Sequence, residues 1–175
     1  MKRFLEKLLT PINPLISLLM RIYEKYAPAA ALDPSAPNHW QEKVLYFFVL
    51  ISVTVGLIVY ILGIYGNISH DYWMILLSVT VGYFVCLFIF FFPRISFTLR
   101  ATLLCLTLYS IGFSIILTVG PFYSAREWLF SFTLLAAVLL RWTGSIAALI
   151  VNLATWVVIA LMIQAGYWDE FFDRA

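Results

Sequence analysis

Charged residues are scarce in this sequence. Asp, Glu, Lys and Arg make up 11% of the 175 residues, whereas 63% are hydrophobic. Soluble domains carry about 25% charged residues, which help to cover their surface. The composition therefore excludes a soluble globular domain. The net charge is only +2 and the cations are dispersed, so we expect no nucleic-acid partner.

Cysteine and histidine are also rare, with two of each. Cys86 and Cys105 lie inside apolar runs, so we expect buried thiols and no disulfide framework. His39 and His70 lack the paired spacing of zinc or haem ligands, so the sequence predicts no metal site and no cofactor.

Long uncharged apolar runs are what the sequence has in abundance. A helix needs about 20 such residues to cross about 30 Å of hydrocarbon. In lipid each backbone N–H must be satisfied within its own segment or in a closed barrel, so we expect helices. The predicted fold is an all-α integral membrane protein, with a bundle of five transmembrane helices over residues 44–175. The expected spans are 44–65, 72–92, 101–119, 125–142 and 145–165.

The fourth span is the least certain in length. Its strictly apolar part, residues 128–140, reaches only about 20 Å as a helix. We expect a capping box of Ser124 and Glu127 to start the helix earlier, and Gly144 to end it. A re-entrant hairpin of the fourth and fifth segments is the alternative.

Two other segments precede the spans. Residues 1–26 carry apolar side chains at helical spacing, which predicts an amphipathic helix on the inner membrane surface or against an intracellular partner helix. Residues 27–43 include three prolines and predict a semi-rigid linker.

Lys and Arg predict the orientation. If the N-terminus is cytoplasmic, only Arg126 and Arg174 of the 11 cationic residues lie outside. Such a bias is typical of multi-pass membrane proteins with this orientation.

Small residues four apart occur in three of the spans. The stretch SVTVG appears at 52–56 and again at 78–82. Such pairs allow helix backbones to approach closely, so we expect the first three spans to pack through them. The pairs are Ser52 and Gly56, Ser78 and Gly82, and Ser110 and Ser114.

No Asp, Glu, Lys, Arg or His lies well inside any expected span, which argues against an ion-coupled transporter. Ser114 follows Gly112 and Phe113, but the next glycine of a nucleophile motif is missing and no histidine lies in a span. We therefore expect no catalytic residue.

Candidate ligand-binding residues gather at the expected outer face. An anionic ligand or a lipid headgroup is expected near Arg126, because it lies at a helix N-terminus. His70, Asp71 and Trp128 lie at the same level, and His70 can titrate near neutral pH. A headgroup-level belt without a specific ligand is the alternative. Asn152, at mid-depth, is expected to hydrogen-bond between helices or to contact a ligand.

The segments NHWQEKVL (38–45) and GPFYSAREWLFSFTLLAAVLLRWTGSIAALIVNL (120–153) resemble the N-terminal membrane region of bacterial sensor histidine kinases, many of them hybrid kinases. The resemblance implies a non-catalytic sensory input module in the bacterial inner membrane, forming a homodimer through its parent kinase. Neither His39 nor His70 resembles the phosphoacceptor of that family. It also implies a sixth span after Ala175, because the kinase must be cytoplasmic. The alternative function is a small membrane subunit or scaffold of a larger complex.

Overall fold

The computed structural model describes residues 38–69, 72–121 and 124–166, together with positions 21, 31, 33 and 35. The expected amphipathic helix of residues 1–26 and most of the linker lie outside the described residues. So do His70 and Asp71.

Every regular element in the described part is a helix, which confirms the expected all-α class. Four helices are long and apolar enough to cross a membrane. The remaining helix, α7, has 15 residues and falls below that length, so the expected count of five spans is not confirmed. The helices are α4 (His39–Ser69), α5 (Trp73–Phe91), α6 (Phe97–Val119), α7 (Ala125–Leu139) and α8 (Arg141–Gln164).

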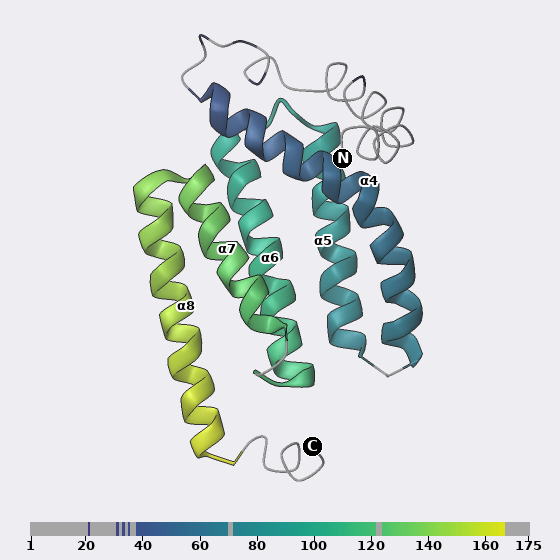
Figure 1. The fold of residues 1–175 in the computed structure, drawn as a ribbon, viewed down its shortest axis with the longest axis vertical. Coiled ribbons are helices and arrows are strands. Elements are labelled where there is room, and N and C mark those ends of the chain that lie inside the picture. Colours follow the sequence, from purple (N-terminus) through teal and green to yellow (C-terminus); the bar gives the residue numbers. More distant parts are fainter. Residues whose placement is uncertain are drawn as a thin grey trace, which may run out of the picture.

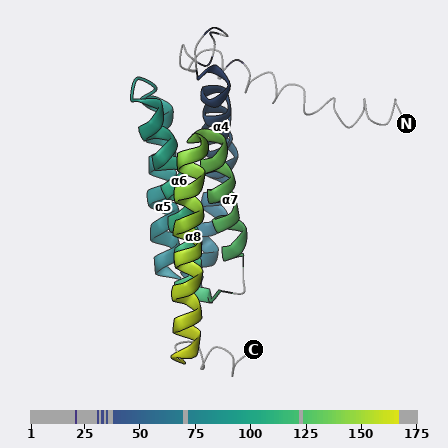
Figure 2. The same cartoon turned by 90° about the vertical axis from the view of Figure 1, so that its left-hand side faces the viewer.

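Consecutive helices run antiparallel and lie side by side, because short connections join them (Figure 1). Each helix packs on its neighbours in sequence, and α4 also reaches α7. Viewed from the side, the helices overlap in a narrow layer (Figure 2). We call the end where α4 and α6 begin the Arg100 end, and the opposite end the Trp73 end.

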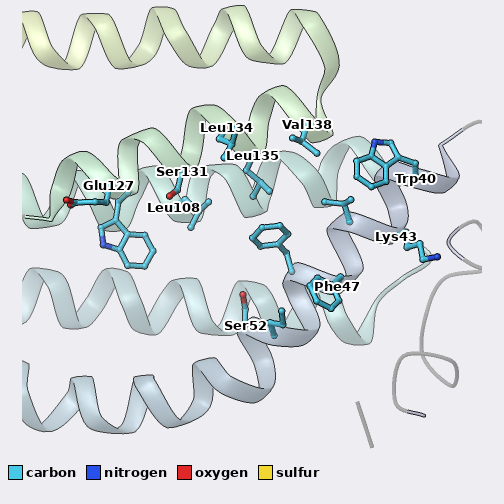
Figure 3. Close-up of a pocket in the computed structure, with 14 residues that line it drawn as sticks. Trp40, Lys43, Phe47, Ser52, Leu108, Glu127, Ser131, Leu134, Leu135 and Val138 are labelled. Carbon is cyan, nitrogen blue, oxygen red and sulfur yellow. The ribbon is translucent and has the colours of Figure 1, made fainter. Parts of the chain in front are cut away.

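Helix α4 is bent, so its first half crosses the layer while its second half runs beside α5 (Figure 1). Ser52 lies at the bend (Figure 3). The Thr54 hydroxyl donates to the Leu50 carbonyl at 2.7 Å, a bond to the preceding turn that often bends helices. Beyond the bend, the rings of Tyr60 and Tyr83 stack with centroids 5.0 Å apart.

Two buried clusters form the core. The cluster at the Arg100 end unites the first half of α4 with α5, α6 and α7, and includes Leu45, Tyr46, Ile89 and Leu139. The second cluster joins α5, α6, α7 and α8 around Ile116. Elsewhere the large apolar side chains are exposed, as expected for a protein whose surrounding solvent is lipid.

The turn between α7 and α8 differs from the expectation. α7 ends at Leu139, and Arg141 takes a positive φ of 61° at the start of α8. Gly144 thus lies in the first turn of α8, and the prediction that it ends the fourth helix is wrong. A Cβ at Gly144 would overlap the Cβ of Leu140, so the tight turn requires a glycine there.

The predicted capping box is also wrong. The Ser124 side chain makes no capping hydrogen bond at the start of α7. Instead the backbone N–H of Glu127 donates to the Ser124 carbonyl at 3.1 Å. Gly120 and Pro121, which precede α7, are buried. Neighbouring parts of the protein therefore cover Gly120 and Pro121.

Three helices begin earlier than predicted, among them α8, which starts at Arg141 where the expected span began at residue 145. α4 starts at His39, so the last five residues of the expected linker, 39–43, are helical. α6 starts at Phe97, four residues before the expected span. These earlier starts place Glu42 and Arg100 inside helices, where the sequence had placed them in a linker and a loop.

Candidate functional site

A buried ion pair joins the first turns of α4 and α6. Arg100 Nη2 lies 2.6 Å from Glu42 Oε1, and the two side chains are only 3% and 6% exposed. Arg100 Nε also donates to the carbonyl of Ile95 at 2.9 Å. The pair therefore fixes the start of α4 against the start of α6 at the Arg100 end.

This ion pair is incompletely satisfied. Glu42 Oε2 and Arg100 Nη1 are buried and have no hydrogen-bond partner among the described residues. Breaking a buried pair by removing one partner costs about 3–5 kcal/mol, because the remaining charge stays uncompensated. The pair is thus weak evidence for high stability, but it strongly opposes separation of the two helices.

A second contact from the same turn reaches α7. Gln41 Nε2 donates to the carbonyl of Val138, near the end of α7, at 3.4 Å. Adjacent residues of α4 therefore bind two different helices. We call Gln41, Glu42, Arg100 and Val138 the α4 anchor.

A groove of about 1190 Å³ lies between the first half of α4 and α7, with Leu108 of α6 at its floor (Figure 3). Most of its lining is apolar. We call it the α4–α7 groove. It is lined by Trp40, Lys43, Val44, Phe47, Phe48, Ile51, Ser52, Leu108, Glu127, Trp128, Ser131, Leu134, Leu135 and Val138.

Charge is confined to the two ends of the groove. Lys43 lies with Trp40 at the Arg100 end, and Glu127 lies at the far end (Figure 3). The hydroxyls of Ser52 and Ser131 are the polar groups between them. Because the interior is apolar and the ends are charged, the groove suits a long apolar ligand with a polar group at one end.

The predicted ligand-binding residues Arg126 and Trp128 have different surroundings on α7. Arg126 is exposed and pairs loosely with Glu127, with 3.4 Å between Nε and Oε1. Arg126 does not line the groove, whereas Trp128 does. His70 and Asp71 lie outside the described residues.

Asn152 connects α8 to α7. Its Nδ2 donates to the Leu129 carbonyl at 2.8 Å and also to Thr133 Oγ1. One turn further along α8, the hydroxyls of Thr155 and Tyr109 hydrogen-bond at 2.8 Å and link α8 to α6. The amide of Asn152 thus serves contacts between helices.

The small-residue pairs behave differently from one another. A Cβ at Gly82 would lie 2.6 Å from Thr107 Cγ2, so α5 and α6 approach closely there. A Cβ at Gly56 would meet only Ser52 of its own helix, at 4.0 Å. Gly56 therefore does not mark a close approach between helices, contrary to expectation. Ser52 itself lies close to the Cys86 side chain of α5.

Another close approach occurs at Gly112, which is not one of the small residues that the sequence pattern selected. A Cβ there would lie 2.9 Å from the Trp128 Cβ and 3.4 Å from the Ala125 carbonyl oxygen. The neighbouring Ser110 and Ser114, together with Ser78, line a smaller groove of about 380 Å³ between α5 and α6. Because Gly112 has no Cβ, α6 and α7 can approach each other closely at this position.

Sequence reasoning missed the α4 anchor because it began each span at the first uncharged residue. The spacing of residues in α4 does indicate that Glu42 is buried. Glu42 precedes Leu45, Tyr46 and Val49 by three, four and seven residues, so it shares their buried helix face. The described part of the chain holds no group of three or more His, Cys, Asp or Glu side chains that could hold a metal ion.

Several apolar helices of membrane-spanning length, joined by short turns and packed in a layer, define a helical membrane domain. The chain matches the model of the MASE11 family over residues 39–174 and belongs to that family. MASE domains are membrane-associated sensor domains. Comparisons with curated proteins and with solved structures gave no match. The membrane and sensor parts of the expectation thus agree with the family, while the histidine kinase parent stays a prediction.

Proposed function

We propose that this domain is the sensory input module of a bacterial signal-transduction histidine kinase in the inner membrane, forming a homodimer through that kinase. The observation that carries the proposal is the MASE11 match, which covers all five described helices. The resemblance to the membrane regions of sensor kinases supplies the output. The domain itself performs no catalysis in this proposal.

The distribution of cations supports a cytoplasmic Arg100 end. Lys43, Arg94 and Arg141 are exposed at that end. Arg126 is the exposed cation at the opposite end among the described residues, and Glu127 partly neutralises it. Excess exposed Lys and Arg is typical of the cytoplasmic side. The N-terminus would then be cytoplasmic.

The length of α7 bears on the topology. Its 15 residues span about 22 Å, less than the hydrocarbon thickness of about 30 Å. Buried Gly120 and Pro121 lie just before it, and irregular backbone is tolerated at membrane depth where protein covers it. We propose that these residues complete a fifth crossing, and that a sixth span after Ala175 returns the chain to the cytoplasm.

Helix α4 is the element best placed to respond to a stimulus. Its first turn is fixed by the α4 anchor, whereas beyond the bend its apolar residues face outward, as at Leu62, which is 69% exposed. A stimulus shifts such an element only if it binds or favours one packing more than the other. In this proposal the bend angle of α4 is the quantity that changes.

The kinase assignment is testable in inside-out membrane vesicles that carry the full-length protein. We expect incorporation of phosphate from ATP into an acid-labile, base-stable form, as phosphohistidine requires. Gln41→Ala, which loosens the α4 anchor without stranding a charge, should change the labelling rate. Leu153→Ala on the exposed face of α8 is the matched control. Absence of acid-labile labelling in the full-length protein would contradict the kinase output.

A second candidate function is a non-catalytic subunit or scaffold of a larger membrane complex. The exposed apolar face of α8 favours it, since only Ala148, Thr155 and Ile159 are buried in that helix. In that case the full-length protein would lack phosphorylation and would purify with a constant ratio of other membrane subunits. Phosphohistidine formation would exclude this alternative as the main role.

A further inference from the structure

We propose that the α4–α7 groove binds an anionic phospholipid, with the headgroup at Lys43 and an acyl chain along the groove. Its volume of about 1190 Å³ exceeds that of most small-molecule pockets, which is about 300–1,000 Å³. The proposed headgroup position at Lys43 lies at the opposite end of the bundle from Arg126. The lipid-binding proposal does not depend on a kinase output, because lipid bound in the groove can be measured without kinase activity.

The headgroup position follows from the charges around the start of α4. Lys43 is exposed at the mouth of the groove, and the ion pairs among the described residues do not involve it. The neighbouring carboxylate of Glu42 is already neutralised by Arg100, so it does not compete for the ammonium group. An ammonium group near the membrane surface attracts anionic lipid headgroups. Trp40 beside it is 66% exposed, as rings at the headgroup level are.

The acyl chain position follows from the apolar walls. Phe47, Phe48 and Leu134 line the groove and are 55%, 47% and 56% exposed. The nine helical steps from Lys43 to Ser52 correspond to about 14 Å along the axis of α4. That length is close to half of the hydrocarbon thickness, about 15 Å. One leaflet's chain would therefore end near the hydroxyls of Ser52 and Ser131.

The charges also decide which end takes the headgroup. Glu127 lines the groove at the Trp73 end, but its carboxylate pairs with Arg126 at 3.4 Å, so this end offers little net positive charge to hold a phosphate. Lys43 lines the other end, where the attraction is favourable. An anionic lipid of the leaflet at the Arg100 end thus fits the groove better than one of the opposite leaflet.

A second copy of the chain fits this groove poorly. In a two-fold symmetric dimer the same surface of each copy faces the other. Groove would then face groove and enclose an unfilled space, contrary to the close packing of protein interiors. The Lys43 residues of the two copies would also lie at the same end and repel one another. A flexible acyl chain fills the groove without either cost.

The test uses the chain in nanodiscs of equal phosphatidylglycerol and phosphatidylcholine, followed by native mass spectrometry after transfer to mild detergent. We expect phosphatidylglycerol to be retained preferentially. Lys43→Gln should reduce that retention about fivefold, the typical contribution of one surface cation. Leu134→Trp and Ser131→Trp, which fill the groove, should each reduce retention of both lipids. Arg94→Gln, an exposed cation at the same end outside the groove lining, should leave retention unchanged.

Three results would overturn the proposal. Equal losses in Lys43→Gln and Arg94→Gln would show general attraction to a charged end. Unchanged lipid retention in a folded groove-filling variant would show that lipids do not occupy the groove. A shift from dimer to monomer in Leu134→Trp, without a change in bound lipid, would identify the groove as a protein interface. Far-UV circular dichroism establishes which variants are folded, and Lys43→Gln still tests the headgroup if both tryptophan variants fail.

Discussion

Glu42 and Arg100 are 58 positions apart in the sequence, yet their side chains meet at 2.6 Å in the buried interior at one end of the bundle. The pair joins the first helix of the described layer to the third. Because Gln41 binds α7 from the same turn, one short stretch of α4 fixes three helices relative to one another.

Removing one partner of this pair should destabilise the domain strongly. We expect Arg100→Met to lower the free energy of unfolding by about 3–5 kcal/mol, because Glu42 is left buried without a counter-charge. The double variant Glu42→Leu with Arg100→Met should recover most of that loss. Unfolding in detergent with increasing SDS, followed by circular dichroism, measures both. A double variant as unstable as the single one would show that the pair is not the cause.

Because α6 and α7 approach closely at Gly112, we expect even an added methyl group at this position to lower the stability of the protein. Gly112→Ala should cost about 1–3 kcal/mol, because the new Cβ meets the Trp128 Cβ and nearby backbone. Gly56→Ala is the matched control, since its new Cβ meets nothing outside its own helix. We expect that variant to be neutral or slightly stabilising, as alanine favours helices. Equal destabilisation of both variants would contradict the assigned contacts.

The amide of Asn152 should contribute modestly to the contact between α7 and α8. Asn152→Leu removes donation to Leu129 and Thr133, and we expect a loss of about 0.6–2 kcal/mol, the range for hydrogen bonds between membrane helices. Leu153→Ala, on the exposed side of α8, should change stability less. A loss in Leu153→Ala equal to that in Asn152→Leu would show that the amide bonds contribute nothing specific.

Both cysteines should resist modification in the folded protein. Cys86 and Cys105 are free thiols and buried in the bundle. We expect N-ethylmaleimide to leave them unlabelled in native membranes and to label both after denaturation in SDS. Rapid labelling of either thiol in the native state would mean that α5 and α6 are not packed as described.

Hydropathy predicted the helices well because the cost of placing charge in lipid dominates the choice of segment. The predicted span 72–92 and α5 (Trp73–Phe91) differ by one residue at each end. The same criterion failed for Glu42 and Arg100, since it treats every charge as lying outside the membrane helices. Two opposite charges that pair inside the protein can lie within such helices. This pair becomes visible only once the packing of α4 on α6 is known.

The small-residue pattern predicted part of the packing. Gly82 lies at a close approach, but Gly56 does not, although each is the last residue of one copy of SVTVG. The bend of α4 explains the difference, because the helix changes direction next to that stretch (Figure 3). The turn from α7 to α8 was missed for a similar reason. Its positive φ at Arg141 is unusual for a residue with a side chain, and no sequence rule expects it.

The most direct test of the membrane topology is to label two engineered cysteines that lie at opposite ends of the bundle. Arg94→Cys and Arg126→Cys both replace exposed residues, while the buried native thiols stay silent. An impermeant maleimide should label Arg126→Cys from outside intact cells, and Arg94→Cys only in inside-out vesicles. Labelling of both positions from the same side would contradict a membrane-crossing bundle whose Arg100 end faces the cytoplasm.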